Sequence, residues 1–74
     1  MTEIIAKNIR NLRLDKNLSQ QALCNKISEQ GYLLKRNTYT KYENGKRTIP
    51  YELICRLAIY YGVSLNYIFG LDNF

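Results

Sequence analysis

The sequence contains no histidine and no tryptophan, and it has one proline, one methionine and two cysteines among 74 residues. Without histidine, the usual zinc ligand sets and catalysis by an imidazole base are excluded. Cys24 and Cys55 do not form a CxxC pair. This spacing favours small apolar residues in a core over a disulfide or a metal site. We therefore expect no metal and no cofactor.

Long apolar segments are also absent. No run approaches the roughly 20 residues of a membrane-spanning helix, and the N-terminal MTEIIAKNIR has neither a long apolar region nor a small-residue cleavage site. These absences predict a cytoplasmic protein that contacts no membrane. Hydrophobic residues make up 46% of the sequence, too many for a disordered tail. The length suits a single domain over residues 1–74 with a thin core.

The charge of the chain is concentrated in one segment. The sequence has 11 Lys and Arg against 6 Asp and Glu, a net charge of +5 at pH 7. Residues 35–47 hold five cations and one acid, so this segment carries +4 and the other 61 residues share +1. Such a local concentration of positive charge favours a polyanionic partner.

Apolar residues recur at helical spacing in five segments, and no stretch alternates with the period of a strand. The expected bounds of the helices are residues 2 or 3 to 15 or 16, 19 to 31, 36 to 44, 49 to 62 and 64 to 70. Serine N-caps and terminal glycines support several of these ends. The sequence therefore predicts an all-α fold, a compact bundle of about five short helices.

The third predicted helix has two distinct faces. At about 100° per residue, Tyr39 and Tyr42 lie together on one side. The other side is a polar arc of Arg36, Asn37, Thr40, Lys41 and Asn44. The tyrosines can anchor the helix, while Arg36 and Lys41 can address guanine and Asn37 can address adenine in a major groove. An ordinary solvated helix surface is the alternative, and the arc alone favours DNA only slightly.

The start of the second predicted helix is a candidate phosphate site. Ser19 and Gln20 open this helix, and the free N–H groups and dipole of a helix N-terminus favour an anion. Gln20 could reinforce such a contact. Taken alone, a capped helix start is nearly always only a helix start.

The order of these parts resembles the phage repressor/Cro-type helix-turn-helix family, also called the XRE type. The resemblance covers about residues 5 to 70 and rests on three pieces in the right order and spacing. They are Leu18-Ser19-Gln20, the block YENGKR at residues 42–47 with Pro50 after it, and Gly62-Val63-Ser64-Leu65. The resemblance implies that the second and third helices form the helix-turn-helix.

The resemblance also implies roles for individual positions. Arg36, Asn37 and Lys41 would read bases, and Thr40 would lie near base edges or the backbone. Gln20 would touch the DNA backbone and come within reach of a base. The residues implied to grip phosphates just past the third helix are Asn44, Lys46 and Arg47. Cys24 stands where the family has a small alanine, which agrees with a buried apolar role.

A lone acid, Glu43, stands among the cations of the basic segment. In the family this glutamate pairs with an arginine near the end of the first helix, and Arg13 matches that position. The helical periodicity is compatible with the pair, because Arg13 borders the buried stripe of its helix. A bidentate Arg–carboxylate contact would tie the two helices together. The alternative is a solvated Glu43 that only reduces the local charge, and we favour the pair.

The turn before the third helix departs from the family pattern. Residues 28–35, SEQGYLLK, make it several residues longer than usual. Lys35 stands where a capping serine is usual, and lysine is a poor N-cap. Asn37 could cap a later start instead, which leaves open whether Arg36 or Asn37 reads the first base. The longer turn also brings Lys35 or Tyr32 within reach of phosphates.

Aromatic residues are more frequent in the C-terminal part than a small core needs. Tyr61 and Phe69 are expected in the core, which leaves a surface patch around Tyr67, Leu71 and Phe74. Family members often pair through this end of the fold. We therefore expect a weak homodimer on a near-palindromic operator, with recognition helices about 34 Å apart.

These patterns predict a sequence-specific regulator of transcription that binds double-stranded DNA, most simply a repressor, and reads the major groove with the helix at about 36–44. A restriction–modification controller and an antitoxin with a protein partner share the pattern. A protein-interaction module is the alternative from another class, but it leaves the basic segment unexplained. No enzyme is expected, because no histidine base or paired carboxylates accompany the candidate nucleophiles. No small-molecule ligand is evident.

Overall fold

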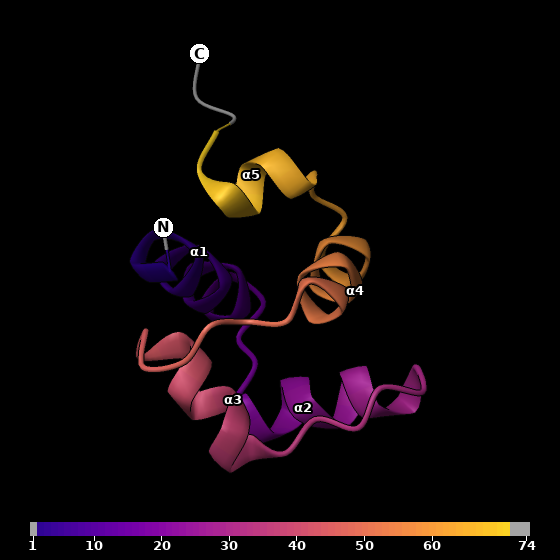
Figure 1. Cartoon of the computed structure of the whole chain (residues 1–74). Helices are drawn as coiled ribbons and strands as arrows, with labels where there is room; N and C mark the ends of the chain where they lie inside the picture. The colour runs from indigo at the N-terminus through magenta and orange to yellow at the C-terminus, as the bar shows by residue number, and fades with distance from the viewer. Residues whose placement is uncertain (1, 72–74) are drawn as a thin grey trace.

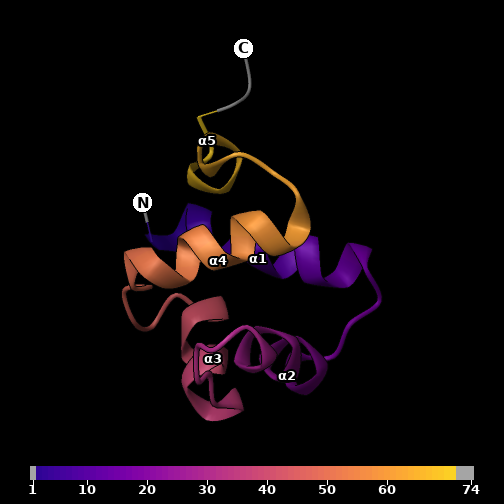
Figure 2. The same cartoon turned by 90° about the vertical axis from the view of Figure 1, so that its right-hand side faces the viewer.

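The computed structural model describes residues 2–71. It contains the helices α1 (Thr2–Asp15), α2 (Gln20–Glu29), α3 (Arg36–Glu43), α4 (Tyr51–Tyr61) and α5 (Leu65–Phe69). No strand is present over this range, so the predicted all-α fold is confirmed. Helices α2 and α3 form one end of the molecule and α5 forms the opposite end, with α1 and α4 between them (Figures 1 and 2).

All five helices contribute to one hydrophobic core. Their fully buried side chains include Ile9, Leu23, Cys24, Ile27, Tyr39, Leu53, Leu57 and Ile68. Half-buried residues at the edges, among them Phe69, pack against this core. Because the core is small, an aromatic ring as large as Tyr39 is a substantial part of the buried apolar surface that stabilises the fold.

Local signals determine most helix ends. The Ser19 hydroxyl accepts from the Ala22 amide at 3.0 Å, and the Ser64 hydroxyl accepts from the Tyr67 amide at 3.0 Å. These bonds satisfy N–H groups that the first turns of α2 and α5 would leave unpaired. Helix α1 closes without a glycine, because Asn17 takes a left-handed conformation with φ 55°.

Helix α5 docks closely on α1. The Asn8 amide donates to the Ile68 carbonyl at 3.0 Å, and so satisfies a carbonyl at the end of α5. Gly70 follows at φ 78°, and a Cβ atom there would lie 2.7 Å from Cγ2 of Ile4. Any larger residue at position 70 would therefore strain the backbone and would require the Ile4 side chain or the end of α5 to shift.

The link between α2 and α3 is held from two sides. The Ser28 hydroxyl accepts from the Leu34 amide at 3.1 Å, and Leu34 is buried. From α4, Arg56 donates to the Gln30 carbonyl at 3.0 Å and lies over the Tyr32 ring, 5.5 Å from its centre. Arg56 therefore fixes the extended turn by a charge-assisted hydrogen bond and a cation–π contact.

Helix α3 begins at Arg36, and Lys35 occupies the N-cap position with φ −91° and ψ 142°. Within the described residues, the Lys35 side chain makes no capping hydrogen bond. The alternative in which Asn37 caps a later start is therefore wrong, and both Arg36 and Asn37 belong to the first turn. Leu34, just before the cap, is buried in the core.

No helix in the described part of the chain combines the length and the hydropathy needed to cross a bilayer.

Candidate nucleic-acid interface

Helix α3 is buried on one face and open on the other. Tyr39 and Tyr42 are buried in the core, as the periodicity predicts. On the outer face Arg36, Asn37 and Lys41 are exposed, and Thr40 is half-buried beside α2. The helix is therefore anchored by two large rings while its long polar side chains point outward, which is the arrangement a probing helix needs.

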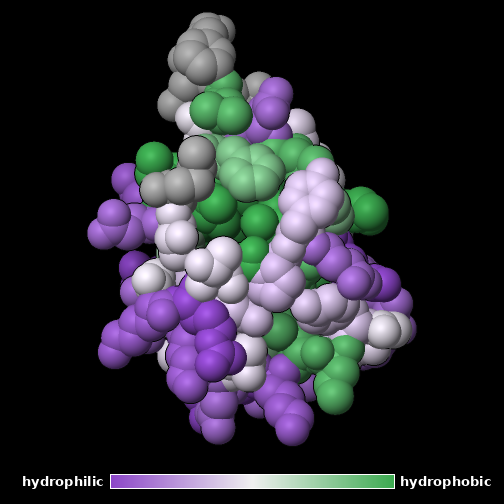
Figure 3. Space-filling view, in the orientation of Figure 1, coloured by the Kyte–Doolittle hydropathy of each residue, from purple (hydrophilic) through white to green (hydrophobic). Residues whose placement is uncertain are grey.

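Exposed cations continue on both sides of α3. Lys35 precedes the helix, and Lys46 and Arg47 follow it, all exposed. Asn44 is exposed at the C-cap, and Gly45 follows in a left-handed conformation with φ 71°. The Lys46 amide then donates to the Lys41 carbonyl at 2.9 Å, which closes the helix and begins the basic segment beyond it. Hydrophilic side chains gather around this end in the space-filling view (Figure 3).

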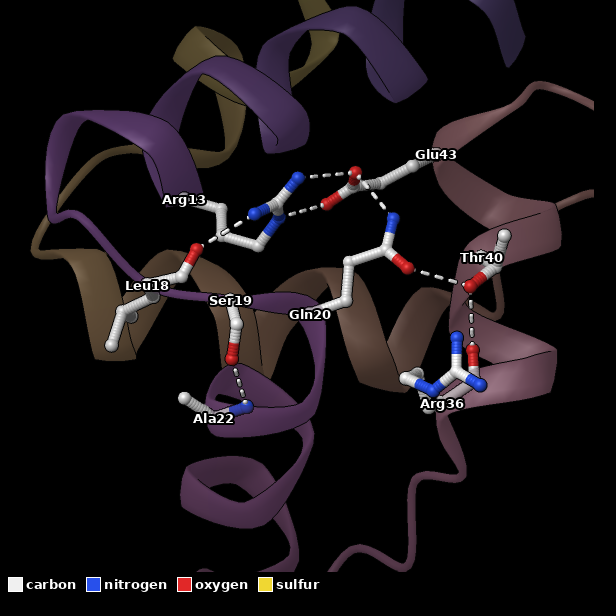
Figure 4. A network of polar contacts seen from close by, with 8 residues as sticks. All are labelled: Arg13, Leu18, Ser19, Gln20, Ala22, Arg36, Thr40 and Glu43. Carbon is white, nitrogen blue, oxygen red and sulfur yellow. Dashed lines mark hydrogen bonds and ion pairs between the residues drawn. The ribbon is translucent and has the colours of Figure 1, made fainter.

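A buried ion pair joins the ends of α1 and α3 (Figure 4). Nε of Arg13 donates to Oε2 of Glu43 at 2.7 Å, and Nη2 donates to Oε1 at 3.0 Å. Their side chains are only 9% and 1% exposed. The third guanidinium nitrogen, Nη1, donates to the Leu18 carbonyl at 2.7 Å and so ties the start of α2 to the pair. Such a bidentate pair fixes relative orientation as well as distance.

The environment keeps both partners charged. Burial acts to raise the pKa of Glu43, but the hydrogen bonds from Arg13 and Gln20 outweigh it and the pKa is lowered. The hydrogen bond to Glu43 raises the pKa of Arg13. The dipole of the nearby Tyr39 hydroxyl also lowers the pKa of Glu43.

Gln20 extends this network to the outer face of α3. Its amide nitrogen donates to Oε1 of Glu43 at 3.0 Å, and its amide oxygen accepts from the Thr40 hydroxyl at 2.6 Å. Arg13, Glu43, Gln20 and Thr40 thus form one chain of contacts through α1, α3 and α2 (Figure 4). Both ends of the Gln20 amide are engaged inside the protein, whereas the resemblance implied only contacts with DNA for this side chain.

Two features of this region are invisible in the sequence. The hydroxyls of Tyr39 and Tyr61 are buried and, among the described residues, have no hydrogen-bond partner. Burial raises the pKa of both tyrosines. The role of Arg56 is also absent from the sequence prediction. Arg56 pairs with Glu52, four residues earlier, at 3.2 Å on the surface. Its contacts with Gln30 and Tyr32 have no signal in the sequence.

The cysteines are free thiols within the described residues. Cys24 is fully buried, and burial raises its pKa to about 11. It therefore stays a neutral apolar thiol at physiological pH. Cys55 is half-buried. In residues 2–71 no three His, Cys, Asp or Glu side chains gather closely enough to hold a metal ion.

Apolar side chains are exposed at the α4–α5 end. Tyr67 and Leu71 are exposed, and Phe74 lies outside the described residues. Ile59 on α4 is more exposed than either, at 76%. A hollow of about 450 Å³ adjoins it, and its lining is Cys55, Ala58, Ile59, Gly62, Val63 and Leu65. The space-filling view shows apolar side chains gathered around α5 (Figure 3).

Comparisons with known proteins agree with this arrangement. A family model described as "Helix-turn-helix" matches residues 9–68. The transcriptional repressor RstR of the cryptic phage CTXphi, from Vibrio cholerae, is 32% identical over 62 residues. The match covers 84% of the present chain and 51% of the repressor, so the chain spans about half the length of this relative. No solved structure matched the chain.

Proposed function

The chain belongs to the helix-turn-helix family, and we propose that it is a sequence-specific regulator of transcription that binds double-stranded DNA, most simply as a repressor. One observation carries the proposal: α3 is anchored by buried Tyr39 and Tyr42 and exposes Arg36, Asn37 and Lys41 on its opposite face. The similarity to a phage repressor supports the regulatory direction.

The exposed face of α3 suits the major groove, which is wide enough for one helix. Arg36 and Lys41 can donate to O6 and N7 of guanine, and the Asn37 amide can pair with N6 and N7 of adenine. Thr40 lies one turn beyond Arg36 at the boundary with α2. Base contacts at the start of α3 fit a helix that enters the groove by its N-terminal end.

The cations that flank α3 suit the DNA backbone. Lys35 at the N-cap and Lys46 and Arg47 beyond the C-cap would each neutralise a phosphate, with Asn44 adding a polar contact. Ser19 and the spare N–H of Gln20 lie at the start of α2, where the helix dipole also favours an anion. Such contacts hold the register of the protein on the duplex without specifying sequence.

We further propose that two copies bind one near-palindromic operator. The exposed Tyr67 and Leu71 at the α5 end would supply apolar contact between the copies. A two-fold dimer would place the α3 helices about one helical turn of DNA apart, roughly 34 Å. A controller or an antitoxin with a protein partner would use the same DNA-binding face and differ only at this end.

Selection of bound duplexes from a random pool, at fixed salt near the physiological range, tests the proposal. We expect an enriched motif arranged as an inverted repeat. A protein-interaction module that reuses the fold would enrich no motif and would show no salt-dependent binding. A single, unrepeated motif would keep the DNA-binding function and refute the dimer.

A further inference from the structure

The Thr40 hydroxyl lies between two hydrogen-bond acceptors. Its oxygen is 2.6 Å from the amide oxygen of Gln20 and 2.9 Å from the carbonyl oxygen of Arg36. A hydroxyl has a single hydrogen to donate and lone pairs with which to accept. Both neighbours can take only that hydrogen, so it is used inside the protein. An outside partner of Thr40 would meet lone pairs.

The buried ion pair determines which end of the Gln20 amide faces Thr40. Arg13 can only donate, and an ionised Glu43 can only accept. The Gln20 atom 3.0 Å from Oε1 of Glu43 must therefore be the NH₂ group. Its oxygen then faces Thr40, and a turned amide would place two acceptor oxygens in contact. The direction of every hydrogen bond from Arg13 to Thr40 is thus fixed (Figure 4).

Thr40 is also positioned where this polarity has a use. It is half-buried at the edge of the polar face of α3, one turn after the exposed Arg36 and next to the exposed Lys41. In the major groove only N6 of adenine and N4 of cytosine present donors, while guanine, thymine and phosphate oxygens present acceptors. A hydroxyl whose hydrogen is already donated inside the protein can accept from those amino groups, but it cannot donate to the acceptor oxygens.

We propose that Thr40 is a specificity-determining residue that accepts a hydrogen bond from the exocyclic amino group of an adenine or a cytosine, and that it does not contact phosphate. The inference rests on the proposed function, because it requires α3 to lie in the major groove. It also gives Gln20 a positioning role, since the Gln20 oxygen holds the hydroxyl in its accepting orientation.

The test compares motifs selected by the wild-type protein with those selected by Thr40→Val, which keeps the shape and removes the hydroxyl. We expect Thr40→Val to lose a preference for adenine or cytosine at one position of each half-site. Thr40→Ser, which retains the hydroxyl, should keep that preference. Thr38→Val is a matched control on the same helix, because Thr38 is also half-buried, and it should change no position.

Base analogues then identify the contacted group. At that position the wild type should lose about three- to tenfold in affinity, the range of one neutral hydrogen bond, when purine replaces adenine or 2-pyrimidinone replaces cytosine. Thr40→Val should be indifferent to the same replacement. Uniform weakening of all sequences by Thr40→Val, or an altered preference for guanine or thymine, would overturn the inference. If the wild type itself enriches no motif, the proposed function fails first, and the two failures are distinct.

Discussion

The α2–α3 end of the molecule exposes a cluster of cations beside the exposed Leu33, whereas the α4–α5 end exposes several large apolar side chains. Around α3 the exposed residues include Arg36, Lys41 and Arg47, whereas on α4 and after α5 they include Ile59 and Leu71. Behind α3 lies a buried polar network that begins at Arg13, and beneath α5 lies close apolar packing against α1. A cationic surface favours charged groups in defined directions, whereas an exposed apolar surface favours nondirectional contact.

The largest loss of stability should come from breaking the buried ion pair at the α3 end. Glu43→Ala leaves the Arg13 guanidinium buried without a counter-ion, so we expect the free energy of unfolding to fall by about 3–5 kcal/mol, measured by urea denaturation. Glu52→Ala is the matched control, because Glu52 is 65% exposed and pairs with Arg56 on the surface. Its loss should be below about 1 kcal/mol. Equal losses for the two variants would contradict a stabilising role for the buried pair.

Changes at the cationic end should separate base reading from charge. Arg36→Ala should relax preference at one base position by about 1–3 kcal/mol. Lys46→Ala should weaken all duplexes about equally and reduce the slope of log affinity against log salt by about one. Titration of the selected duplex and its single-base variants at several salt concentrations measures both. If Arg36→Ala weakened every duplex equally, Arg36 would be a backbone contact instead.

Changes at the apolar end should act on association alone. Leu71→Ser should weaken self-association by about 1–3 kcal/mol for each leucine that is buried in the dimer. Sedimentation in the presence of the operator duplex measures this self-association. Leu14→Ser provides the control, because Leu14 is 46% exposed and Leu71 is 49% exposed. A dimer that both substitutions weaken equally, or that neither affects, would place the contact elsewhere.

The smallest expected effect is a dependence of stability on acid. Burial acts to raise the pKa of Glu43, but its hydrogen bonds, led by that from Arg13, lower it below the ordinary value of 4.5. A lowered pKa in the folded state stabilises the protein above pH 4.5, and this contribution is lost as the pH falls through the folded-state pKa. The free energy of unfolding, measured at several values between pH 7 and pH 3, should therefore fall more steeply with decreasing pH for the wild type than for Glu43→Gln. Identical pH profiles would mean that Glu43 has the same pKa folded and unfolded.

The helix bounds were predictable because local residues set them. Ser19 and Ser64 cap their helices, and left-handed Gly45 and Gly62 end α3 and α4. These signals act over a few residues and can be recognised without the fold. Asn17 ends α1 in the same way, but asparagine adopts that conformation less readily than glycine, so the signal is weaker.

The site was predictable only in part. The exposed face of α3 follows from helical periodicity, and the partners Arg13 and Glu43 came from the resemblance to the family. The inward turn of Gln20 and the support of the long turn by Arg56 were not foreseen. Gln20 meets Thr40 across 20 residues of sequence, and Arg56 meets Gln30 across 26. Such contacts depend on how the helices pack, which no local pattern reports.

If the exposed face of α3 reads bases and does not merely attract phosphates, the protein must discriminate between duplexes of equal charge. The most direct test is the ratio of affinities for the selected duplex and for a scrambled duplex of the same length and composition, at one physiological salt concentration. We predict a ratio of about a thousandfold or more, the range of specific DNA-binding proteins. Equal affinities for the two duplexes would show that the cations act as a nonspecific charged surface and that α3 reads no bases.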